Sequence, residues 1–142
     1  MRVMALDVGE RRIGVAVCDP LGITAQGVET YTRKGEVQDE AHFDELLQTW
    51  QVERLVVGLP RHMNGDEGDS AQKARAFGDA LSARYGLPVT YVDERLTTVA
   101  AHRALSEGNA NHKKRKNAVD MLAAVMILQS YLQGLAAGRE VE

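Results

Sequence analysis

The alternation of apolar and polar positions predicts strands in the first part of the chain and strands separated by helices in the second. Five runs have the apolar, β-rich composition of strands, namely residues 1–8, 13–18, 23–31, 54–59 and 89–93. The polar segment 9–12 between the first two runs is typical of a hairpin turn. These runs predict a sheet of about five strands.

Helical spacing appears in the segments between and after the later strands. The predicted helices cover residues 38–51, residues 70–85, a stretch from Thr97 or Thr98 to about Gly108, and about residues 117–135. In the first of these, Phe43, Leu47 and Trp50 fall on one face, and the opposite face is acidic. In the second, Ser70 is a good N-cap and Gly86 suits the position after the helix. Strands in hairpins followed by strands alternating with helices predict an α/β fold, a mixed central sheet with helices on both faces.

The bulk composition predicts one domain in a reducing compartment. The 142 residues have the usual size of one compact domain, so we expect a single domain over 1–142. Cys18 is the only cysteine, which excludes an intrachain disulfide framework and suits a cytoplasmic location. The first apolar run is too short and too polar for a signal peptide or a membrane span, so no membrane partner is expected.

Charge is segregated along the chain. The net charge is -3, which argues against a protein that coats nucleic acid through its overall charge. Residues 36–48 carry five acidic residues and no Lys or Arg, whereas Lys113, Lys114, Arg115 and Lys116 are consecutive in a polar connection over 109–116. The basic run predicts a local site for phosphates, and the alternative is a solvated run of charge.

Two acidic residues interrupt or end apolar strands. Asp7 lies inside the first strand, where a carboxylate is costly to bury unless a positive group pairs with it. The alternative is an aspartate that caps its own turn. Glu94 ends the run that begins at Val89, and strand alternation places Asp93 and Glu94 on opposite faces. The alternative for Glu94 is a surface ion pair with Arg95.

A third acid, Asp120, lies near the start of the last apolar helix. A carboxylate in a first helical turn is favoured by the helix dipole, and this is the alternative to a functional role. Together, Asp7, Glu94 and Asp120 are distant in sequence but can converge at one end of a sheet. Carboxylate oxygens are the ligands that Mg²⁺ and Mn²⁺ prefer, so we expect these three acids to be catalytic and to hold two such ions.

Several basic and polar residues lie in turns near the predicted metal site. The candidate substrate-binding residues are Arg11 and Arg12 in the hairpin turn, Arg61, His62 and Asn64 in the loop after Pro60, and Lys113, Lys114, Arg115 and Lys116. Side chains of these types can contact phosphates. Exposed, soluble turn and loop residues are the alternative for each of them.

Four segments of the chain together resemble the YqgF/RuvX family: ALDVGERRIGVAVCD, VVGLPRHMNG, DERLTT and KRKNAVDMLAAVMILQ. The resemblance implies a ribonuclease-H-like domain whose metal-binding acids match Asp7, Glu94 and Asp120. It also implies a cytoplasmic bacterial nuclease acting on structured nucleic acid, with maturation of the 16S rRNA 5′ end favoured. The second segment departs from the family pattern, because Arg61 and His62 stand where an apolar residue and an amide are common.

Other functions fit parts of this pattern. Cleavage of Holliday junctions is the alternative within the family. Its substrate would be branched DNA in place of precursor rRNA. This reaction requires two symmetric cuts, so a homodimer is possible. A non-catalytic nucleic-acid-binding or transcription-associated factor would use the three acids structurally. An actin-like or sugar-kinase ATPase also begins with a similar hairpin, but those enzymes need two such domains, and 142 residues supply one.

Overall fold

The structure is a computed structural model that describes residues 1–60, 64–97 and 112–138, and of residues 112–118 the backbone only. The strands are β1 (Val3–Val8), β2 (Arg12–Cys18), β3 (Ala25–Thr32), β4 (Arg54–Leu59) and β5 (Val89–Asp93). They form one sheet in the order β3-β2-β1-β4-β5. Strands β1, β2 and β3 pair antiparallel, and β1, β4 and β5 pair parallel. The predicted mixed sheet is confirmed.

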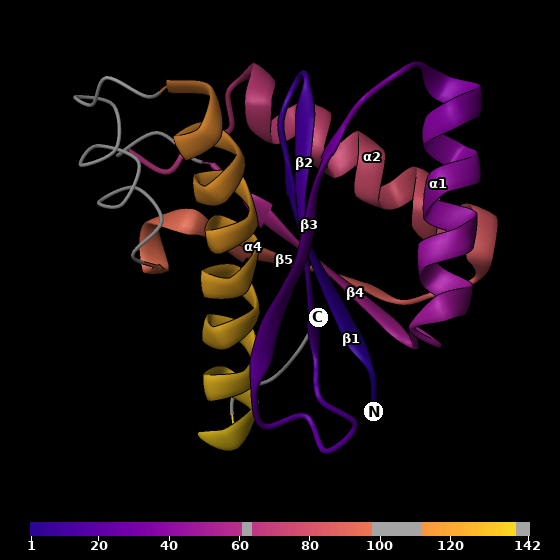
Figure 1. Ribbon diagram of the computed structural model, residues 1–142. Helices are drawn as coiled ribbons and strands as arrows, with labels where there is room; N and C mark the ends of the chain where they lie inside the picture. Colours follow the sequence, from indigo (N-terminus) through magenta and orange to yellow (C-terminus); the bar gives the residue numbers. More distant parts are fainter. Residues whose placement is uncertain (61–63, 98–111, 139–142) are drawn as a thin grey trace.

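Helices cover both faces of this sheet, as the sequence predicts (Figure 1). The described helices are α1 (Glu36–Thr49), α2 (Asp69–Tyr85), the short 3-10 helix η1 (Glu94–Leu96) and α4 (His112–Ala136). Helix α4 lies along one face, and α1 and α2 lie on the other. The helix predicted from Thr97 or Thr98 to Gly108 falls almost entirely outside the described residues.

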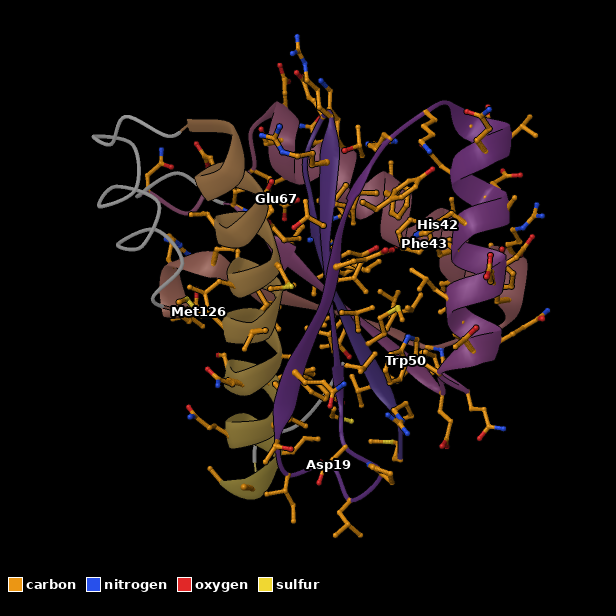
Figure 2. The ribbon with its side chains drawn as sticks, viewed as in Figure 1. Asp19, His42, Phe43, Trp50, Glu67 and Met126 are labelled. Atoms are coloured by element: carbon orange, nitrogen blue, oxygen red, sulfur yellow. The ribbon has the colours of Figure 1, made fainter. Side chains whose placement is uncertain are left out.

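The alternation of side chains along β1 divides the interior into two cores. Met4 and Leu6 pack on the side of α1 and α2, where Phe43 reaches from α1 towards the sheet (Figure 2). Val3 and Ala5 pack on the other side against α4. Because successive strand residues point to opposite faces, Asp7 follows Val3 and Ala5 onto the face covered by α4.

Helix α4 begins earlier than its apolar pattern indicates. It starts at His112, so the prediction of a basic connection up to residue 116 is wrong, and Lys113 to Lys116 lie in the first turns of the helix. Lysine and arginine are good helix formers but carry no apolar periodicity, which explains the difference. By length and composition the stretch Val119–Ala136 could cross a membrane, but its apolar face packs on the sheet, as expected of a core helix.

Two details of α1 and α2 also differ from the prediction. Helix α2 begins at Asp69 with Gly68 as its N-cap, so Ser70 is the second helical residue and not the cap. In α1, Asp39 is buried rather than part of a solvated acidic face. It accepts hydrogen bonds from the Tyr31 hydroxyl at 2.7 Å and from the Lys34 backbone at 2.9 Å. Asp39 therefore fastens α1 to the end of β3.

Candidate functional site

Asp7 is flanked on the sheet by two glycines. Gly14 of β2 is its direct partner, and Gly58 of β4 follows Val57, the partner of Leu6. A Cβ atom on Gly14 would lie 1.9 Å from the carbonyl oxygen of Asp120 in α4. On the other side, a Cβ atom on Gly58 would lie 2.4 Å from Cδ1 of Ile127. Helix α4 therefore lies close to the sheet beside Asp7 because both neighbours of Asp7 lack a side chain.

Asp120 points towards the β1–β2 hairpin, where its Oδ2 atom lies 2.9 Å from Nε of Arg12. The two side chains are 21 % and 25 % exposed. Asp120 lies about two turns inside α4, because the helix begins at His112. The helix dipole acts mainly on the first turn, so the interpretation of Asp120 as a helix-terminal acid is wrong.

Glu94 is the first residue of η1, directly after β5, and it is 5 % exposed. The backbone amide of Thr97 and its hydroxyl both donate to the Glu94 carbonyl oxygen, which fixes this turn. A Cβ atom on Gly58 would lie 3.4 Å from Cγ of Glu94, so the Glu94 side chain lies beside the glycine that neighbours Asp7. Glu94 is thus a buried acid close to the same strand ends.

Asp93 has a different environment from its neighbour Glu94, as strand alternation predicts. Its carboxylate accepts hydrogen bonds from the Arg95 guanidinium, the shortest at 2.6 Å, and from the Arg95 backbone amide at 2.9 Å. The acid that pairs with Arg95 in this way is therefore Asp93. These bonds hold the chain in the turn that carries Glu94.

A cleft of about 370 Å³ lies at the end of the sheet where β1 ends and β2 begins. Its lining residues come from the hairpin, from the end of β4 and from two helices: Asp7, Val8, Gly9, Glu10, Arg11, Arg12, Pro60, Ser70 and Asp120. Two of the three predicted acids, Asp7 and Asp120, thus share one cleft with both hairpin arginines. Glu94 is not among the residues that line it.

The predicted metal ligands fit a divalent cation in kind but not in spacing. Asp7, Glu94 and Asp120 offer carboxylate oxygens, which suit Mg²⁺ or Mn²⁺. Within the part of the chain that the structure describes, however, no three His, Cys, Asp or Glu residues gather closely enough to hold a metal ion. In this structure Asp120 is engaged by Arg12 instead. The assignment of these three acids as metal ligands therefore stays a prediction.

The hairpin turn that carries Arg11 is held in place by contacts that the sequence does not reveal. Lys73 of α2 donates to Glu10 at 2.7 Å, and this bond together with the charge of Lys73 lowers the pKa of Glu10. The Arg33 guanidinium donates to the Gly9 carbonyl at 3.1 Å, and the Arg33 amide donates to the Arg11 carbonyl at 2.8 Å. The turn is therefore tied to α2 and to Arg33, the residue that directly follows β3.

Of the remaining predicted substrate-binding residues, Asn64 does not line the cleft, and the others lie wholly or with their side chains outside the described residues. Asn64 forms a local turn, in which its Oδ1 accepts from the Asp66 amide at 3.0 Å. Arg61 and His62 lie outside the described residues, as do the side chains of the basic run Lys113, Lys114, Arg115 and Lys116. The backbone of that run belongs to α4, the helix that carries Asp120.

Asp19, a further acid in the first of the four segments that carry the family resemblance, is distant from the cleft. It lies at the other end of β2, in the turn that leads to β3 (Figure 2). Its carboxylate accepts hydrogen bonds from the backbone amides of Ile23 and Thr24, at 2.6 and 3.0 Å. These bonds lower the pKa of Asp19, with that from Thr24 the largest cause, and explain the residue as a cap of its turn.

Comparisons with known proteins agree with this architecture. Residues 1–134 match the sequence profile of the family described as RuvX, Holliday junction resolvase. A protein of Heliobacterium modesticaldum, provisionally named pre-16S rRNA nuclease, is 52% identical over 136 residues, which cover 96% of this chain and 91% of that protein. A protein of Moorella thermoacetica with the same name is 52% identical over 135 residues, covering 95% and 96%.

Among solved structures, RuvC of Thermus thermophilus superposes with a TM-score of 0.62 over 100% of this chain and 99% of that one. The sequence identity is 15%, so this likeness concerns the fold. It supports the ribonuclease-H-like arrangement of the mixed sheet and its helices that the resemblance implies.

Proposed function

This chain belongs to the RuvX family, and from that membership we propose that it is a metal-dependent nuclease that hydrolyses phosphodiester bonds in structured nucleic acid, with precursor 16S rRNA as its substrate. The observation that carries the proposal is the cleft in which Asp7 and Asp120 meet Arg11 and Arg12. Acids that bind cations and arginines that bind phosphates are the two kinds of group that phosphoryl transfer requires.

Each part of the cleft has a role in this proposal. Asp7 and Asp120, with Glu94 as the third acid, would hold two Mg²⁺ or Mn²⁺ ions. The chemistry that such ions would supply when bound is activation of a water molecule and stabilisation of the leaving oxygen. Arg11 lies on the exposed side of the cleft and binds a phosphate next to the scissile one. The close packing of α4 on Gly14 fixes the distance between the strand that carries Asp7 and the helix that carries Asp120.

The basic run at the start of α4 extends this site in our proposal. Lys113, Lys114, Arg115 and Lys116 precede Asp120 on one continuous helix. Phosphates bound by the run would be held at a fixed distance along the helix from Asp120, since an α-helix is a stiff element with a regular rise. The part of the RNA next to the cleavage site would lie along this basic run, and the scissile bond would lie in the cleft.

Precursor rRNA is favoured because the relatives that are about half identical to this chain are named for it. Processing of rRNA would place the protein in the cytoplasm. The second candidate is resolution of Holliday junctions, which the description of the family favours. That reaction needs two symmetric sites and therefore a homodimer.

A cleavage assay tests the proposal. Purified protein is incubated with an end-labelled fragment of precursor 16S rRNA and, separately, with a four-way DNA junction, in Mg²⁺ or Mn²⁺ and with or without chelator. We expect metal-dependent cleavage that the chelator abolishes and that Asp7→Asn lacks. Binding to both substrates without any cleavage would instead identify a non-catalytic nucleic-acid-binding protein.

A further inference from the structure

The contact between Arg12 and Asp120 involves one of the three acids of the proposed site. We propose that Arg12 is a positioning residue that holds Asp120 apart from the other acids until a divalent cation displaces its guanidinium. This inference rests on the proposed function, because it assumes that Asp120 binds the metal. It accounts for the engagement of Asp120 by Arg12 in a cleft that Asp120 shares with Asp7.

The backbone on both sides of this ion pair is fixed. Arg12 is the first residue of β2 and pairs with Thr32 of β3. The carbonyl oxygen of Asp120 in α4 packs against the backbone of Gly14. The helix cannot come closer to the strand here without a clash, and rotation of the two side chains is enough to change their partners.

The strength of the pair suits such an exchange. Its atoms lie 2.9 Å apart, which is the length of a good charge-assisted hydrogen bond. Both side chains are partly exposed, at 25 % and 21 %, so solvent screens the pair and Arg12 holds Asp120 only modestly. A divalent cation that contacts several carboxylates at once can therefore displace a single guanidinium.

Displacement of Arg12 has a second consequence at the cleft. Arg11 and Arg12 both line the cleft, and Arg11 is exposed there. Once released from Asp120, the Arg12 guanidinium adds its positive charge to that of Arg11. The cleft then gains affinity for a phosphate at the moment that the metal is bound.

Binding of Mn²⁺ to the full chain, measured by isothermal titration calorimetry without nucleic acid, tests this inference. We expect Arg12→Gln to bind Mn²⁺ about threefold to tenfold more tightly than the wild type, because the competing guanidinium is gone. Arg11→Gln is the matched control: it removes the same charge one residue earlier, and its affinity should stay within about twofold of the wild type. Asp120→Asn should lose most of the binding.

The outcomes separate this inference from the proposed function. Binding that Asp120→Asn abolishes but that Arg12→Gln leaves unchanged or weakens would overturn the role of Arg12 and leave the metal site standing. Wild-type protein that binds no Mn²⁺, or binding that Asp120→Asn does not affect, would overturn the metal site as well. If Arg12→Gln does not fold by circular dichroism, Arg12→Lys compared with Arg11→Lys replaces it. The same rise in affinity, smaller in size, is then expected only at position 12.

Discussion

The carbonyl oxygen of Asp120 packs directly on Gly14, the residue that pairs with Asp7 across the sheet. This packing sets how closely α4 approaches the strand that carries Asp7. A side chain at position 14 cannot be accommodated without a shift of the helix, because its Cβ atom would lie 1.9 Å from that oxygen. The glycine therefore positions two of the proposed catalytic acids relative to each other.

Gly14→Ala should accordingly impair both stability and activity. Overpacking of this kind typically costs about 1–3 kcal/mol of unfolding free energy. A displacement of catalytic groups by about 1 Å can reduce the rate by about a hundredfold. Urea unfolding and cleavage rates measure the two effects. Gly27→Ala is the matched control, since the three atoms nearest to its Cβ atom would all belong to the flexible side chain of Met121, and it should cost less on both measures. Equal effects of the two variants would contradict the positioning role of Gly14.

Conservative neutralisation of each proposed metal ligand should abolish cleavage. Asp7→Asn, Glu94→Gln and Asp120→Asn each remove a negative charge that holds the cation, and we expect rates to fall by orders of magnitude at saturating substrate while the fold persists. Circular dichroism checks the fold. Asp19→Asn is the control, because Asp19 lies at the other end of β2 and its carboxylate caps its own turn. A variant that keeps the wild-type rate would exclude that residue from the site.

Neutralising the basic run should weaken binding more than chemistry. Replacing Lys113, Lys114, Arg115 and Lys116 by glutamine removes cations that displace counterions when they bind phosphates. The slope of log K against log salt should therefore flatten by about 0.7 to 0.9 for each phosphate that the run neutralises in the wild type. Arg84→Gln is the control, since Arg84 pairs with Glu40 and Asp44 far along α2. An unchanged slope would show that the run is a solvated helix surface.

The sequence predicts the sheet and the helices on its two faces well, because each strand and helix has its own local apolar pattern. The start of α4 is missed because the basic turns at its beginning carry no such pattern. The burial of Asp39 is readable from the sequence, since Asp39 stands one helical turn before Phe43 and so shares its face. The Arg12–Asp120 pair is not readable, because it joins residues 108 positions apart in the chain. Local periodicity carries no information on such pairs.

The buried carboxylate of Asp39 predicts a specific dependence of stability on pH. Burial alone would raise the pKa of Asp39, but hydrogen bonds from the Lys34 backbone, the Tyr31 hydroxyl and the Arg33 guanidinium together lower it. Its folded pKa therefore lies below the value of about 3.9 in the unfolded chain. The stabilisation is present in full above that value and is lost as the pH falls through the lowered folded pKa.

Asp39→Asn should therefore be less stable than the wild type at pH 7, by about 1.5–3 kcal/mol for the missing charged hydrogen bonds. The difference should shrink as the pH falls below about 4. Urea unfolding of both proteins between pH 3 and 7 measures it. Glu45→Gln, at an exposed position of the same helix, should show little difference at any pH. A difference for Asp39→Asn that stays constant with pH would show that packing rather than charge holds this site.

The distribution of positive charge bears on the choice between RNA and branched DNA. A four-way junction presents four duplex arms and demands a broad positive surface, since each phosphate contact needs a nearby cation. This chain has a net charge of -3. Within the described part of the chain, Arg11 and Arg12 line the cleft, while Arg33 and Lys73 hold its hairpin turn. The basic run precedes Asp120 in the first turns of α4. These few groups suit a short stretch of phosphates on a single strand that extends from a structured region of RNA.

RNA with a single-stranded flank beside a helix should therefore be cut faster than a four-way DNA junction at equal metal and salt. Matched single-turnover rates on the two substrates measure the preference, and a blunt RNA duplex of the same sequence tests the need for a flank. Dimerisation would double the positive surface, so sedimentation of the protein with each substrate belongs to the same experiment. Paired symmetric cuts in the junction by a dimer, at rates above those on the flanked RNA, would make junction resolution the primary reaction. Faster cleavage of the flanked RNA by a monomer would show that the cleft of a single chain is sufficient for the reaction. Every residue that lines this cleft comes from one copy of the chain.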